Sequence, residues 1–328
     1  MIKKLFIRAF ILLIPLLMTG GYFLISDPMK VVYEYCSPLK AGVLMNDRLF
    51  QIRWLNKHEQ DYNSFVFGSS RSKAFKTPEW KQNLPDGSLP FHMGVNDESL
   101  FGVVKKLQYL DQKGYSIDHV IFIMDHRLLS LLKNSDVHIF RDYYEITGES
   151  YGAYYKRFFT SFLNVSFLSH YFNYKISGKI EKDNIYLWDS GFTYDKTTGD
   201  HYYERMDSLI RYDSINYYQE QKEKVFYERK PMESVDLIGG QAEQFLHEIK
   251  AVLSRHNSDY QLIITPNYDQ VQLSGNDRLK LESIFTSDKI LDVSGVNDMT
   301  SDYRNYYEHK HFKPYIASQL MKQVYFQP

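Results

Sequence analysis

Short segments that are apolar throughout alternate with amphipathic segments along most of this chain, and this alternation restricts its fold more than any other feature. The apolar segments are predicted strands at Ser64–Gly68, Leu89–Gly94, His119–Met124, Tyr260–Thr265 and Ile290–Val293. Between them, Leu100 to Leu110 and Ala242 to Leu253 place apolar residues at the spacing of one helix face. Strands that are wholly apolar are buried on both faces, so helices must cover both sides of their sheet. The chain is predicted to be an α/β protein, with a three-layer α/β/α domain and a mostly parallel sheet.

The N-terminus carries a second constraint. Lys3, Lys4 and Arg8 precede a run from Ala9 to Ser26 that has no charged residue and is mostly apolar. A bilayer-spanning helix needs about 20 apolar residues, so this run is just long enough for one transmembrane helix. The basic residues before the run, with Asp27 after it, predict a cytoplasmic N-terminus and an extracytoplasmic remainder.

A cleaved signal peptide is the alternative interpretation of this segment. Thr19, Gly20 and Gly21 supply small residues near a suitable cleavage position. The apolar run continues beyond them, however, from Tyr22 to Ile25. We therefore favour a retained signal anchor.

The domain organisation follows from these patterns. Residues 1–28 are predicted to be a cytoplasmic tip and signal anchor, residues 29–60 a membrane-proximal lead-in, and residues 61–328 the α/β domain. Within that domain, residues from about 140 to 235 are too many for a simple crossover and predict a mostly helical insertion. This insertion is rich in aromatic residues, and the whole chain has 28 tyrosines and 22 phenylalanines. Such residues either fill the core, which we favour, or form a platform for sugar rings.

Charge and cysteine content exclude several function classes. The net charge is −1 with acids and bases interspersed, which gives no indication of a nucleic-acid partner. Cys36 is the only cysteine, so neither an intramolecular disulfide nor a cysteine-based metal cluster can form. No His-Glu-x-x-His motif or paired-carboxylate cluster occurs. We expect neither a metal ion nor another cofactor.

Polar residues follow several of the predicted strands. Ser69 and Ser70 follow the first, Asp125 ends the third, and Glu308 and His311 follow the last. In a parallel sheet these positions share the edge where ligands bind. A serine hydroxyl needs a base to attack an ester, and a carboxylate on the other ring nitrogen fixes the tautomer of that base. Each residue alone is ordinary, since Gly-Ser-Ser is a common turn with serine as the helix N-cap. Together they predict a Ser-His-carboxylate triad.

In this order the motifs resemble those of the SGNH (GDSL-like) hydrolase superfamily. The matching pieces are Gly68-Ser69-Ser70, Gly94 and Glu308-x-x-His311. The resemblance implies a flavodoxin-like sheet, with Ser70 as nucleophile, His311 as general base and Glu308 in place of the usual aspartate. It also implies that the backbone amides of Ser70 and Gly94 stabilise the oxyanion.

Two parts of the pattern leave alternatives open. Family members usually have an oxyanion-donating asparagine after the third strand, where this chain has Asp125, and an ionised carboxylate cannot donate. Asn96 or Arg127 would then have to supply the donor. Near the C-terminus, Asp302 and His309 compete for the roles of acid and base. Only Glu308 and His311 keep the family spacing, and His309 is expected to face solvent.

An anchor followed by such a domain resembles membrane-anchored proteins of cell-envelope acyl modification, such as alginate O-acetylation and teichoic-acid D-alanylation proteins. The resemblance implies a serine esterase or acyltransferase acting on acyl groups, chiefly O-acetyl groups, of an envelope polysaccharide. It also implies a single-pass protein of the cytoplasmic (inner) membrane with a periplasmic domain and a membrane-bound acyl-transfer partner. The alternative is a catalytically inactive scaffold that presents the glycan to such a partner, because fold does not determine function.

Overall fold

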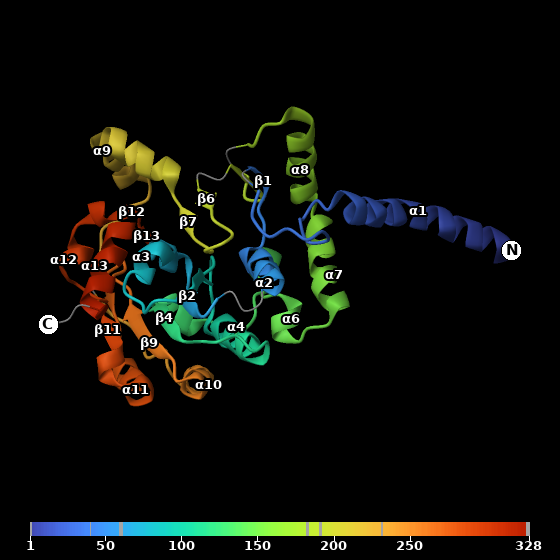
Figure 1. Cartoon of the computed structure of the whole chain (residues 1–328). Helices are drawn as coiled ribbons and strands as arrows, with labels where there is room; N and C mark the ends of the chain where they lie inside the picture. Colours follow the sequence, from blue (N-terminus) through green and yellow to red (C-terminus); the bar gives the residue numbers. More distant parts are fainter. Residues whose placement is uncertain are drawn as a thin grey trace. The chain divides into compact units, whose positions relative to one another are not determined.

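The computed structural model describes residues 2–39, 41–58, 62–181, 184–189, 192–230 and 232–325. The chain divides into two compact units, of which unit 1 comprises Met1–Arg53 and Asp136–Ser190, and unit 2 comprises Trp54–Ser135 and Gly191–Pro328. Helix α2 (Asp47–Lys57) contains the boundary between the two. Figure 1 identifies the elements along the chain. The domain boundary that we predicted at residues 60–61 lies outside the described residues.

A parallel sheet of five strands forms the centre of unit 2, in the order β11-β9-β4-β2-β3. The strands are β2 (Ser64–Gly68), β3 (Pro90–His92), β4 (His119–Met124), β9 (Asp259–Ile264) and β11 (Ile290–Asp292). All neighbouring strands in this sheet run parallel. From β2 the chain passes to β3 on one side and then to β4 on the other. The carboxyl ends of these three strands therefore lie together at one edge of the sheet.

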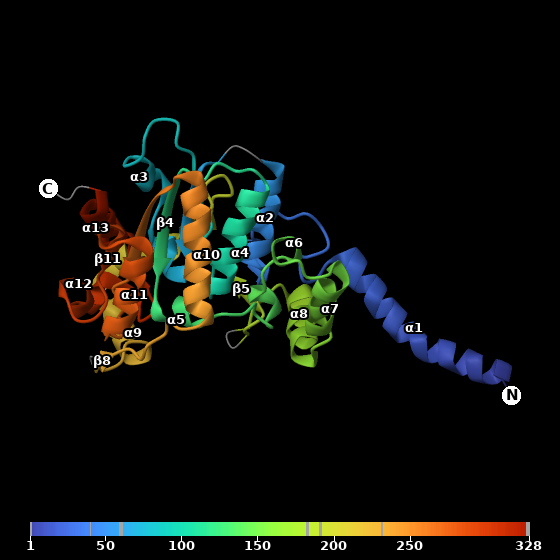
Figure 2. The ribbon, with the colours of Figure 1, turned by 90° about the horizontal axis from the view of Figure 1, so that it is seen from below.

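Helices cover both faces of this sheet because successive strand residues point to opposite sides. On one face Val66, Ile121 and Ile263 share an apolar cluster with Trp80 of α3 (Thr77–Lys81) and with the buried side of α13 (Pro314–Tyr325). Phe65, Phe67 and Phe122 are buried on the other face. There α4 (Leu100–Gln112) packs against α10 (Gln241–His256), and Figure 2 shows these two helices side by side.

The other elements of unit 2 are short connections and strand pairs, apart from α9 and α11. The 3-10 helices are η1 (Ser70–Ala74), η3 (Ser287–Lys289) and η4 (Tyr303–Asn305), and the α-helices are α5 (His126–Ser130), α9 (Glu204–Lys224), α11 (Gly275–Phe285) and α12 (Asp298–Ser301). The paired strands are β6 (Thr193–Tyr194) with β7 (His201–Tyr202), β8 (Met232–Glu233) with β10 (Val271–Gln272), and β12 (Tyr306–Glu308) with β13 (His311–Phe312). Helix α9 is kinked at Asp213, where the backbone leaves the helical region.

The predicted α/β class with a parallel sheet is confirmed, and the first and third strands have the predicted bounds. The second strand was predicted too long, since β3 ends at His92 rather than Gly94. Beyond His92 the Met93 and Val95 amides still donate to the β2 carbonyls of Val66 and Gly68, while the Gly94 amide between them donates to the His92 ring at 3.1 Å. Apolar character alone could not predict where regular pairing gives way to these single contacts.

Unit 1 gathers the start of the chain with the first part of the aromatic segment. Besides α1 (Ile2–Ser26) and β1 (Ala41–Val43), its elements are η2 (His138–Phe140), α6 (Tyr144–Thr147), α7 (Tyr151–Phe162), α8 (Val165–Ser177) and β5 (Leu187–Asp189). The ring of Phe23 lies 5.3 Å from that of Phe159, which joins the end of α1 to α7. We predicted one insertion over residues 140–235, whereas residues 136–190 group with residues 1–53 and the remainder belongs to unit 2.

Helix α1 covers the apolar run of the N-terminus and ends at Ser26, directly before Asp27. Asp27 is buried and accepts hydrogen bonds from the amides of Val31 (2.8 Å) and Tyr33 (2.9 Å), which fixes the turn after the helix. We expected a transmembrane helix here. Within the part of the chain that the structure describes, no helix meets the length and apolarity needed to cross a membrane.

Candidate active site

The turn after β2 holds Ser70 at the carboxyl edge of the sheet. Gly68 has φ +157°, and a Cβ atom at this position would lie 2.6 Å from the Ile123 carbonyl oxygen, so the close approach of β2 and β4 requires glycine. Ser69 is the N-cap of η1, and its hydroxyl accepts from the Arg71 amide. Ser70 is therefore the first residue of η1. Its amide is among those that a helix leaves without a carbonyl acceptor of its own.

Asp125, at the end of β4, ties this turn in place. Its carboxylate accepts hydrogen bonds from Ser69 Oγ at 2.6 Å and Arg71 Nη1 at 2.9 Å, and it also caps α5. Burial raises the pKa of Asp125, but the Arg71 charge and these hydrogen bonds outweigh burial, and the pKa lies below its ordinary value. Asp125 is thus an ionised acceptor that positions the residues on either side of Ser70. We identified it in the sequence as a missing oxyanion donor and did not foresee this role.

The structure brings Ser70, His311 and Glu308 into one hydrogen-bonded chain. Ser70 Oγ lies 2.7 Å from His311 Nε2, and His311 Nδ1 is hydrogen-bonded to Glu308. Since an ionised carboxylate only accepts, Nδ1 carries the proton and Nε2 is left to accept from the serine hydroxyl. Glu308 and His311 face each other across the β12–β13 hairpin. The hairpin therefore presents both residues to the nucleophile turn.

Glu308 is held as a carboxylate. Its second oxygen accepts from the Lys310 amide at 2.8 Å. Burial raises the pKa of Glu308, but the hydrogen bond and charge of His311, the Lys310 amide and the nearby His309 together hold it below the ordinary 4.5. The negative charge that a protonated His311 needs is thus present at neutral pH.

The competing residues at the C-terminus have other partners. Asp302 is the N-cap of η4 and pairs with Arg304, whose Nη2 lies 2.8 Å from its carboxylate. His309 was expected to face solvent, and that prediction is wrong. The His309 side chain is half-buried, with its ring 5.6 Å from the ring of Tyr227. Its Nδ1 is 3.7 Å from Glu308, too far for a hydrogen bond.

Helix α9 supports the hairpin from the other side, a feature that sequence reasoning missed. Tyr217 and Tyr218 donate their hydroxyl groups to the backbone oxygens of Tyr307 and Tyr306, each at 2.9 Å. Tyr307 in turn is hydrogen-bonded to Asp207 of α9. The Tyr203 ring lies 6.3 Å from the His311 ring. The second half of the aromatic segment thus holds the hairpin that carries His311, and the Tyr217-Tyr218 pair was the signal for this in the sequence.

The predicted oxyanion donors differ in their partners. The Gly94 amide already donates to His92, whose pKa burial lowers to about 3, so His92 is neutral and its Nδ1 can accept. Asn96 Oδ1 accepts from Lys73 Nζ at 2.9 Å. Arg127 is largely exposed and pairs with Asp97. Asn96 therefore differs from Arg127 in its partner, because Lys73 belongs to η1, the 3-10 helix that begins at Ser70.

A cavity of about 630 Å³ lies next to the hairpin, between α9 and the segment from Asp302 to Tyr315. The residues that line it include three tyrosines and three charged residues, which are Tyr218, Tyr303, Tyr315, Asp302, Arg304 and Lys313. The Lys313 ammonium stands 4.9 Å from the centre of the Tyr218 ring. Aromatic faces beside polar groups are the surfaces on which sugar rings stack.

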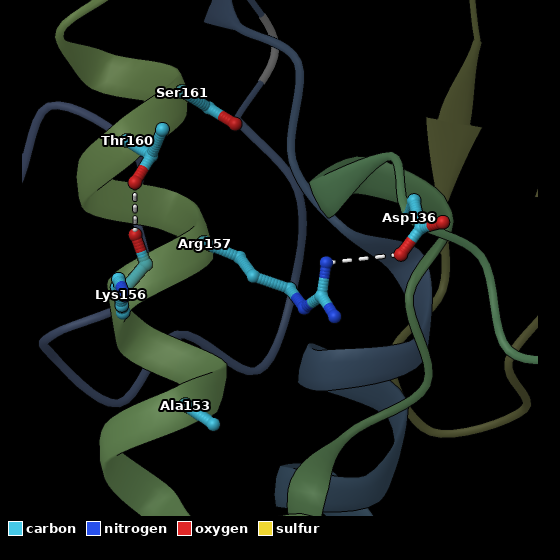
Figure 3. Close-up of a pocket in the computed structure, with 6 residues that line it drawn as sticks. All are labelled: Asp136, Ala153, Lys156, Arg157, Thr160 and Ser161. Carbon is cyan, nitrogen blue, oxygen red and sulfur yellow. Dashed lines mark hydrogen bonds and ion pairs between the residues drawn. The ribbon is translucent and has the colours of Figure 1, made fainter.

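Unit 1 contains another cavity, of about 450 Å³, formed by α7 and Asp136 (Figure 3). Arg157 donates to the exposed Asp136 at 2.9 Å, and Thr160 donates to a backbone oxygen of its own helix. The six residues that line this cavity include no histidine, so they form no serine-histidine pair. Among the described residues of the whole chain, no group of three or more His, Cys, Asp or Glu side chains is arranged to hold a metal ion.

Comparisons with known proteins add nothing to this geometry. No protein-family model matches the sequence. A search of the curated proteins also finds no match. The assignment of a function therefore rests on the site itself.

The lowered pKa of Glu308 predicts a pH-dependent contribution to stability. Its charge stabilises the folded state above the ordinary glutamate pKa, and this contribution is lost as the pH falls through the lower folded value. Glu308→Gln should therefore melt below wild type at pH 7, and the difference should disappear in acid. Thermal unfolding across a pH series measures it, with exposed Glu220→Gln as a control that changes little. A difference that is constant over all pH values would contradict the expectation.

Proposed function

We propose that this protein is a serine esterase or acyltransferase that acts on acyl groups, chiefly O-acetyl groups, of a cell-envelope polysaccharide. The observation that carries the proposal is the hydrogen-bonded chain from Ser70 through His311 to Glu308. The Ser70–His311 distance is within the range of a nucleophile and its general base. Polar side chains of three strand ends and a hairpin converge there, as they do at the sites of open α/β sheets.

The reaction that we propose runs in two halves. Ser70 Oγ attacks the ester carbonyl carbon while its proton passes to His311 Nε2, and Glu308 stabilises the imidazolium. The tetrahedral oxyanion collapses, the bond to the leaving alcohol breaks, and His311 returns the proton to that alcohol. Ser70 then carries the acyl group as an ester. Water or a sugar hydroxyl gives its proton to His311 and attacks this ester. The second tetrahedral intermediate breaks its bond to Ser70 Oγ, His311 returns the proton to that oxygen, and acid or a new acyl ester is released.

The strand order supports an SGNH-like assignment. Numbered along the chain, β3-β2-β4-β9-β11 is the order 2-1-3-4-5 of flavodoxin-like sheets, whose ligands bind where the order reverses. In this chain the order reverses at β2, the strand that leads to Ser70. We propose that the three motifs resemble those of the SGNH superfamily because this chain shares the reaction chemistry of that superfamily as well as its strand order.

This assignment predicts a sharp kinetic pattern. Ser70→Ala and His311→Ala should each abolish hydrolysis of short acyl esters, and the double variant should lose no more, because triad members act as a unit. Glu308→Gln should reduce turnover by roughly 10⁴-fold, by analogy with the aspartate-to-asparagine change in serine proteases.

Turnover of these variants on a short acyl ester tests the pattern, with His309→Ala and Asp302→Asn as matched controls that stay near wild type. Loss of turnover in His309→Ala together with full activity in His311→Ala would show that the base is placed wrongly. A wild type without any esterase activity would support the alternative of an inactive scaffold.

We propose that the cavity between α9 and the 302–315 segment binds the polysaccharide. Tyr315 is the residue to substitute in a test of this site, because it lines the cavity and is 44% exposed. Removing its ring should therefore not unfold the protein. Tyr315→Ala should raise KM for an acylated polysaccharide by about 2- to 10-fold, the equivalent of one aromatic contact. Its turnover of a short ester should not change.

Tyr212 provides the control for this experiment. It also belongs to α9 but is 94% exposed and does not line the cavity. Steady-state kinetics of both variants on polymer and on short ester decide the question. Equal KM values for Tyr315→Ala and Tyr212→Ala on the polymer would rule out this binding site.

We also propose that residues 1–28 anchor the protein in the cytoplasmic membrane as a single transmembrane helix and place the rest in the periplasm. The support is the basic flank before Ala9 and the exposed apolar side chains of α1, such as Leu17, Met18 and Ile25. Protease added to spheroplasts should digest the α/β domain, and only detergent should release the protein from membranes. Protection from protease would reverse the orientation, and release by salt alone would exclude the anchor.

A further inference from the structure

Lys73 is a buried lysine one turn after the proposed nucleophile. It belongs to η1, and only 2% of it is exposed. Lysine is rarely buried completely unless its ammonium is well partnered. The Lys73 Nζ atom donates to Asn96 Oδ1 at 2.9 Å and lies 5.9 Å from the centre of the Phe192 ring. The buried Lys73 ammonium group is therefore hydrogen-bonded to the Asn96 carboxamide.

The backbone brings this carboxamide alongside the nucleophile turn. The Met93 amide donates to the Val66 carbonyl at 2.8 Å, and the Val95 amide donates to the Gly68 carbonyl at 3.1 Å. The segment after β3 therefore keeps following β2 beyond the end of the ladder. The Val95 bond to Gly68 holds this segment beside β2 as far as the start of the nucleophile turn, and Asn96 is the next residue.

Gly94 makes this approach possible. A Cβ atom there would lie 1.9 Å from Ser72 Oγ and 2.5 Å from His92 Cε1, so both of these side chains would have to move. With glycine at this position, the loop lies directly against η1. Lys76 adds a further restraint, since its Nζ donates to the Lys73 carbonyl at 2.6 Å.

The contact with Lys73 also decides which way the carboxamide points. An ammonium group has donors and no acceptor, so only the oxygen of Asn96 can face it. The Nδ2 group, with its two N–H donors, must then point away from Lys73. A flipped amide would set donor against donor and lose the hydrogen bond. The hydrogen bond from the Lys73 ammonium group thus fixes the direction in which Asn96 Nδ2 points.

We propose that Lys73 is a positioning residue of the acyl-transfer site, which holds the Asn96 carboxamide with Nδ2 toward the oxyanion that forms at Ser70. The inference rests on the proposed esterase or acyltransferase function. It supplies a second donor beside the Ser70 amide, because Asp125 only accepts and the Gly94 amide is bonded to His92. The Ser70 amide and Asn96 Nδ2 together then stabilise the oxyanion.

The test compares variants on a short acyl ester. Lys73→Met keeps an unbranched apolar side chain up to the Cε position but removes the charge and donors of Nζ, and its kcat should fall by about 10²–10³-fold, the effect of losing one oxyanion donor. KM should change little, because the donor acts in the transition state. Lys73→Arg retains a cationic donor and should recover part of the rate. Asn96→Ala should match Lys73→Met, and the double variant should be no slower than either.

Asn96→Asp separates catalysis from folding. A carboxylate at this position would pair with Lys73, so its melting temperature should equal or exceed that of wild type, while its kcat falls like that of Asn96→Ala because the N–H donors are gone. Should Lys73→Met fail to fold, this variant decides alone. Wild-type kcat in Asn96→Asp, or losses in Lys73→Met and Asn96→Ala that multiply in the double variant, would overturn the inference while the esterase function stands. An inactive wild type would overturn both.

Discussion

The position of Ser70 at the candidate site depends on the parallel pairing of β2 with β3 on one side and β4 on the other. Parallel strands end at the same edge, so the turn after each one meets the turns after its neighbours. Asp125, after β4, binds the turn that carries Ser70, and Asn96, after β3, is held by the helix that Ser70 begins. The turn that carries Ser70 is thus fixed from both sides by residues whose positions follow from strand order.

His311 and Glu308 reach this edge differently, on a two-stranded hairpin outside the main sheet. A hairpin this short has little stability of its own. Its position is set by the core, where Tyr306 and Phe312 join the cluster on one face of the sheet, and by α9, whose tyrosines hold its backbone. The aromatic segment therefore supports the hairpin that carries His311, and it also lines the cavity beside that hairpin.

Much of this arrangement could be predicted from the sequence, and the reasons are local. The strands Ser64–Gly68 and His119–Met124 are apolar throughout, and Glu308 and His311 keep a spacing that one tight hairpin brings to one side. What could not be predicted depends on partners far along the chain. The role of Asp125 depends on Ser69, and the place of His309 depends on Tyr227. The grouping of residues 136–190 with the N-terminal segment likewise depends on contacts such as Phe23 with Phe159.

The central claim is that Ser70 is a nucleophile activated by His311, and a fluorophosphonate probe tests it most directly. The purified protein would be incubated with the probe, digested, and its modified residue located by peptide mass spectrometry. The account predicts phosphonylation of Ser70 in wild type and its loss in His311→Ala, because an unactivated serine does not react. An unlabelled wild type, or a label on Ser69 or Ser72 instead of Ser70, would contradict it.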